Sequence, residues 1–126
     1  MNYLKFGWAE VDITPDKKVS LAGQFAERIS EYVEKPLTAT AMAVESEDDQ
    51  MVLVSVDIVA IGYKLVEEIR VKLADNQVGL DPMKVVFSAI HTHTAPCYDY
   101  ADRAEICLRC RQDLSGIGFC ASASEL

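Results

Sequence analysis

The residues with the clearest chemical potential are two histidines that follow an apolar stretch. Residues 84–90 read KVVFSAI, and His91-Thr92-His93 comes next; these are the only histidines among the 126 residues. Neutral imidazole is a favoured zinc ligand, and a catalytic zinc usually keeps three protein ligands and one open position for water. In an extended backbone, residues two apart project to the same side, so we expect both rings to reach one site. The H-x-H spacing therefore predicts part of a metal site.

An aspartate on a neighbouring stretch is a candidate partner for these histidines. Asp57 lies in VSVDI, near the end of another apolar run. Its carboxylate is expected either to orient a histidine by a hydrogen bond or to help bind the metal. The competing interpretation is structural: the histidines end a strand with their ring donors bonded to backbone carbonyls, and Asp57 caps the following turn. The position at the end of a strand favours the metal interpretation.

The cysteines form a second group of potential ligands, and all four lie in the last third of the chain: Cys97, Cys107, Cys110 and Cys120. One C-x-x-C pair is present, but no second pair completes a zinc knuckle. A thioredoxin-like redox pair is disfavoured because the motif does not open a helix after a strand. The boundary in composition divides the chain into an α/β segment, residues 1–96, and a divergent tail, residues 97–126, which we interpret as truncated or frame-shifted.

The elements that must position the histidines follow from the apolar periodicity. We expect an irregular excursion at 19–35, an amphipathic helix at 63–75 and strands at 5–13, 37–45, 51–61 and 84–90. The order strand, helix, strand predicts a crossover between parallel strands, and the almost wholly apolar 51–61 predicts a strand covered on both faces. The expected fold is α/β: a mixed sheet with this crossover and a covering helix, as an incomplete part of a larger domain. Ligands of such sheets bind beyond the carboxyl ends of the strands, where the histidines fall.

Composition narrows the class of protein. Half of the residues are hydrophobic and a quarter are charged, which is typical of a soluble globular chain. A net charge of -8 opposes binding to nucleic-acid phosphates. The sequence has no apolar run long enough for a transmembrane segment and no signal-peptide layout, so the expected location is the cytoplasm, with reduced cysteines.

Five pieces of the chain resemble the amino-terminal part of the neutral/alkaline (non-lysosomal) ceramidase family. They are GWAEVDITP, LAGQ, KPLTATAMAVES, MVLVSVDIVAI and VVFSAIHTHTAP, in this order. The resemblance covers residues 6–96, and HTHTAP after the apolar strand is its most specific element. It implies a Zn²⁺-dependent hydrolase that splits the N-acyl amide bond of ceramide-like molecules by means of metal-activated water.

The resemblance also implies roles for individual residues. His91 matches the zinc ligand, and His93 matches the catalytic histidine beside the polar head of the substrate. Gly23 matches a substrate-binding glycine in a loop near the site, and Asp57 has a supporting role. The family completes its zinc shell with another histidine, a glutamate and a tyrosine from further along a longer chain, whereas this sequence has no third histidine.

Two functions therefore remain open. The first is a zinc-dependent amide hydrolase of which this chain is a fragment with part of the site. The alternative is a non-catalytic fragment or interaction module without bound metal, which associates with itself or with the missing remainder of the domain. Such a module is expected to have an exposed apolar surface.

Overall fold

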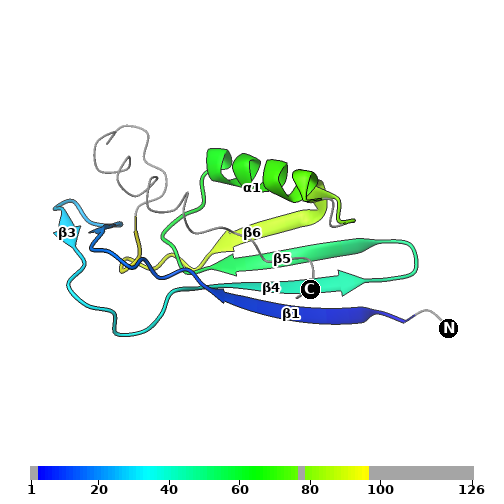
Figure 1. Ribbon diagram of the computed structural model, residues 1–126, viewed down its shortest axis with the longest axis horizontal. Coiled ribbons are helices and arrows are strands. Elements are labelled where there is room, and N and C mark those ends of the chain that lie inside the picture. Colours follow the sequence, from blue (N-terminus) through cyan, green and yellow to red (C-terminus); the bar gives the residue numbers. More distant parts are fainter. Residues whose placement is uncertain (1–2, 77–78, 97–126) are drawn as a thin grey trace.

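A computed structural model describes residues 3–76 and 79–96 and contains two sheets and one α-helix (Figure 1). The larger sheet has the order β1-β4-β5-β6 and is formed by β1 (Lys5–Asp12), β4 (Thr38–Glu45), β5 (Gln50–Val56) and β6 (Val85–Ala89). Helix α1 (Tyr63–Asp75) and the short 3-10 helix η1 (Pro82–Lys84) connect β5 to β6, while β2 (Ser20–Leu21) and β3 (Arg28–Ile29) form a separate hairpin. The cysteine-containing tail predicted at 97–126 lies outside the described residues.

The predicted fold class is confirmed. Strands β1, β4 and β5 are antiparallel neighbours, whereas β5 and β6 are parallel. Parallel neighbours need a crossover, which here contains α1. The observed bounds of α1 match the predicted helix 63–75. In the described part of the chain, no helix has the length and apolar character needed to cross a membrane.

Local hydrogen bonds form where strands β1 and β5 end. After β1, Thr14 donates its amide to the Asp12 carboxylate at 2.8 Å, and this bonding holds the pKa of Asp12 below its ordinary value. Strand β5 ends at Val56 rather than at residue 61, because the Ile58 amide turns back to the Val56 carbonyl at 2.9 Å. The chain then leaves the sheet and enters α1, so the strand predicted at 51–61 is shorter than expected.

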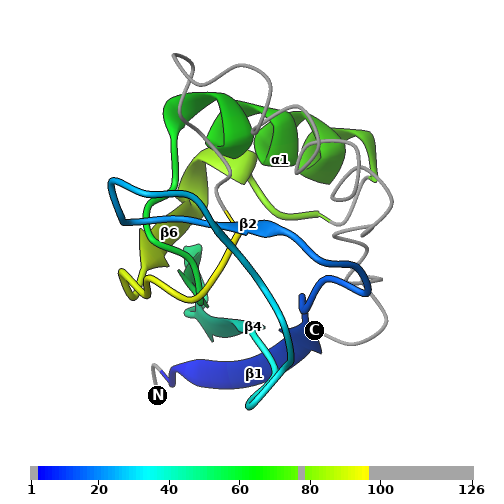
Figure 2. The ribbon, with the colours of Figure 1, turned by 90° about the vertical axis from the view of Figure 1, so that its left-hand side faces the viewer.

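The core lies on one face of the larger sheet. Three of its buried side chains come from β5, and Leu73 of α1 packs against the cluster. The whole cluster consists of Ile13, Ala39, Val52, Val54, Val56, Ile58, Val85 and Ala95. Figure 2 shows α1 on one side of the sheet. Alternation along each strand sends every second side chain to the opposite face.

That opposite face carries two aligned apolar rows. Cross-strand partners project to the same side of a sheet, and the register places Trp8, Met42, Leu53 and Val86 in one row and Phe6, Val44 and Met51 in the next. The sequence predicted that the strand at 51–61 is covered on both faces, and this prediction is wrong for the described residues. Leu53 and Met51 are 36% and 40% exposed, because α1 covers only the other face.

Candidate functional site

The loop after β6 carries both histidines and lies at the carboxyl ends of the parallel strands. The Ile90 amide donates to the Val56 carbonyl at 3.1 Å, and the His91 amide donates to the Ile58 carbonyl at 3.0 Å. These bonds fasten the loop to the segment that leaves β5. The β2–β3 hairpin lies at the same end of the molecule (Figure 1).

His91 adopts an uncommon backbone conformation. Its φ is 63°, in the left-handed region that costs a residue with a Cβ about 1–2 kcal/mol. The expected extended backbone is therefore absent at His91. Strained residues of this kind concentrate at functional sites, so the outlier supports a functional hypothesis for this loop.

The hydrogen bond of the His91 ring defines which nitrogen is free. Nδ1 lies 2.7 Å from the carbonyl oxygen of Val59. A carbonyl oxygen can only accept, so Nδ1 must donate, and the Nε2 of a neutral ring keeps its lone pair. Histidines that bind metals usually donate their second ring N–H to a carbonyl, a carboxylate or water. The bond to Val59 therefore leaves His91 in the form that a metal ligand requires.

His93 lies beside His91 and against the hairpin. The ring centroids of the two histidines are 5.1 Å apart, with an angle of 62° between the ring planes. Gly23, at a φ of 88°, faces the ring of His93: a Cβ at Gly23 would come within 2.5 Å of this ring. The structure thus brings together three of the residues predicted from sequence, His91, His93 and Gly23.

Asp57 binds elsewhere. Its Oδ2 accepts from the amide of Thr38 at 2.8 Å and from the hydroxyl of Thr38 at 3.1 Å, and the Asp57 amide donates to the Thr38 carbonyl at 2.9 Å. These bonds join the end of β5 to the start of β4. The carbonyl of Val59 orients His91 instead, a contact for which the sequence has no signal because every residue has a carbonyl.

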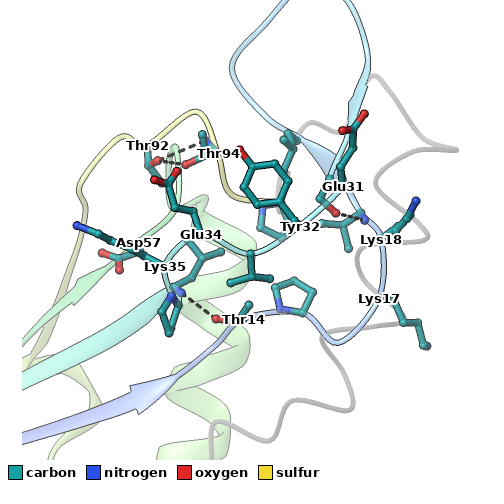
Figure 3. A pocket seen from close by; sticks show the side chains of 18 of the residues that line it. Thr14, Lys17, Lys18, Glu31, Tyr32, Glu34, Lys35, Asp57, Thr92 and Thr94 are labelled. Atoms are coloured by element: carbon teal, nitrogen blue, oxygen red, sulfur yellow. Dashed lines mark hydrogen bonds between the residues drawn. The ribbon is translucent and has the colours of Figure 1, made fainter.

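A groove of about 1030 Å³ lies beside the loop that carries the histidines. Thr92 and Thr94 line it, together with Asp57 and much of the segment 28–37, whereas neither histidine does. Figure 3 shows the side chains of Thr92, Thr94 and Tyr32 among those that line the groove. Neither imidazole therefore belongs to the lining of this groove.

The donor set fits a zinc ion in part. The bond to Val59 uses Nδ1 of His91 and leaves the lone pair of Nε2 for a metal, and the second imidazole lies next to this ring. Within residues 3–76 and 79–96, no group of three histidine, cysteine, aspartate or glutamate side chains is placed to hold a metal. A catalytic zinc site needs about three protein ligands, so further ligands would have to come from outside this part of the chain.

Neither a protein-family model nor a curated protein matches this chain. The features that point to a role for the histidines are therefore their geometry and the HTHTAP motif.

Proposed function

We propose that this chain supplies the first part of the active site of a zinc-dependent hydrolase that acts on N-acyl amide bonds of ceramide-like molecules. One observation carries the proposal. The Nδ1 of His91 donates to the Val59 carbonyl, and this bond leaves Nε2 available to a metal. The left-handed backbone of His91 supports the proposal, because strained backbone conformations of this kind concentrate at functional sites.

Each residue of the site then has a distinct role. His91 would bind the Zn²⁺, which when bound lowers the pKa of a water molecule and polarises a carbonyl group. His93, beside it, would contact the polar head of the substrate and exchange a proton with it. Gly23 leaves room for this ring. Asp57 would support the site indirectly by fixing Thr38 at the start of β4.

Hydrolysis of a fluorescent ceramide analogue tests this function. Because the zinc shell needs further ligands, the chain is assayed with added Zn²⁺ as part of a longer protein that supplies them, beside His91→Ala, His93→Asn and, as a control, Lys64→Gln on the exposed side of α1. We expect release of the fatty acid by the parent chain and by Lys64→Gln, with a loss of at least 100-fold in both histidine variants. Equal rates in all four proteins would overturn the proposal.

The exposed sheet face favours a second function, that of an interaction module. An aromatic side chain offers about 150–250 Å², so Phe6 and Trp8, at 57% and 64% exposed, present on the order of 250 Å² together. With Met51, Leu53 and Val86 the face presents on the order of 500 Å², and two copies would bury about the 1,000 Å² that a specific interface needs. We therefore propose a second copy of the chain as its partner.

A further inference from the structure

The β2–β3 hairpin and the histidine loop are joined by backbone contacts. The Ala22 amide donates to the Ala95 carbonyl at 2.9 Å, and Leu21 forms an isolated antiparallel bridge with Pro96. Strand β2 thus pairs with β3 on one edge, while Leu21 and the adjacent Ala22 pair with residues 95–96 on the other. Because Ala95 and Pro96 are buried, this junction excludes water and gives the loop a defined place on the hairpin.

Arg28, the first residue of β3, makes an additional contact across the junction. Its Nη2 donates to the carbonyl of His93 at 2.5 Å and to that of Ala22 at 3.3 Å. In the part of the chain that the structure describes, no carboxylate forms an ion pair with this guanidinium, and its Nε is buried without a partner. The guanidinium of Arg28 therefore binds backbone carbonyls, and a charged donor binds a carbonyl more strongly than a neutral donor does.

The two histidines are consequently held by different parts of the fold. His91 is bound by the carbonyls of Ile58 and Val59, which follow β5 of the larger sheet. His93 is bound by Arg28 at its carbonyl and meets Gly23 at its ring, and both contacts come from the hairpin. The relative position of the two rings then depends on how the hairpin docks.

We infer that Arg28 is a positioning residue that fixes the imidazole of His93 relative to that of His91. The planar guanidinium suits this task because its fixed geometry reaches two carbonyls at once, whereas the ammonium of a lysine is a compact charge on a flexible stem. The catalytic meaning of this inference rests on the proposed function, but the positioning itself does not.

Histidine NMR spectra of the metal-free full chain test the inference. The chain has only two histidines, so His91→Ala assigns both sets of ring signals. Arg28→Met and Arg28→Lys are compared with Arg70→Met, a control in α1 whose arginine also has a buried Nε without a partner in the described structure. We expect the His93 ring shifts to move in Arg28→Met, partial rescue in Arg28→Lys, and unchanged His91 signals.

Two results would overturn the inference: unchanged His93 signals in both Arg28 variants, or equal movement of the His91 and His93 signals. If Arg28→Met does not fold, as judged by its circular dichroism, Arg28→Lys decides by the same criteria. Because neither zinc nor substrate is present, failure of the proposed hydrolase function would leave this result intact. Hydrolytic activity with unmoved His93 signals would leave the function standing and reject Arg28 as its positioning residue.

Discussion

Gly23 lies directly against the imidazole of His93: a Cβ at Gly23 would fall 2.5 Å from both Cγ and Cδ2 of that ring. Real Cβ atoms do not approach other atoms so closely, so any larger residue at this position must displace the ring or the hairpin. The backbone of Gly23 is also left-handed, with a φ of 88°. Two independent constraints therefore select glycine here.

Gly23→Ala should destabilise the chain more than Gly79→Ala does. Gly79 has a similar φ of 73°, but a Cβ there meets nothing within 4 Å. Both substitutions bring the left-handed cost of about 1 kcal/mol, and only Gly23→Ala adds the clash, for an expected total of about 2–3 kcal/mol. Urea unfolding of the two variants measures the difference. Equal losses would show that the His93 contact constrains nothing.

His91→Gly should be more stable than His91→Ala. Both variants lose the bond to Val59, but glycine adopts a φ of 63° without the steric cost that alanine bears. We expect a difference of about 1 kcal/mol in the free energy of unfolding. Thermal and urea unfolding provide the measurement, and an alanine variant as stable as the glycine variant would argue against strain at this residue.

Asp57 should contribute mainly to the junction of β4 and β5. Asp57→Ala leaves the Thr38 amide without its acceptor and is expected to cost about 1–3 kcal/mol of unfolding free energy. Thr38→Val removes only the hydroxyl donor and should cost less, about 1 kcal/mol. Unfolding and zinc titration are measured on the same samples. A loss of zinc binding in Asp57→Ala without a loss of stability would instead assign Asp57 to the metal site.

The apolar rows on the sheet should drive self-association. Leu53→Glu and Trp8→Glu place a charge within the rows and are expected to convert a dimer into a monomer, because a buried unpaired carboxylate is costly. Val71→Glu is the matched control, since Val71 is equally apolar and 60% exposed but lies on α1. Light scattering after gel filtration gives the mass. A parent chain that is monomeric at high concentration would contradict this prediction.

The sequence predicts the sheet better than it predicts the site. Periodicity locates α1 and the long strands because each buries one regular face, and the strand-helix-strand order is sufficient to predict the parallel pair. The sequence could not show whether one or both faces of residues 51–61 are covered, because the apolar pattern, including Leu53, is the same in either case. Exposure is a property of the whole fold and not of the local pattern.

The hairpin and its contacts show the same limit for the site. Strands β2 and β3 have two residues each, too few for a periodic signal, and the bond from Arg28 to His93 spans 65 residues. The H-x-H motif correctly indicates two neighbouring rings, but the reason differs from the predicted one, because His91 is left-handed rather than extended. Side-chain chemistry is readable in the sequence, whereas the carbonyls that orient it are not.

Zinc content is the most direct test of a metal site at His91. The purified chain is dialysed against dilute Zn²⁺, and bound metal is measured by mass spectrometry for the parent, for His91→Ala and for a variant with all four cysteines changed to serine. We expect about one zinc per chain, lost in His91→Ala and retained in the serine variant. Zinc that is lost only with the cysteines, or absent from the parent chain, would contradict a metal site at His91.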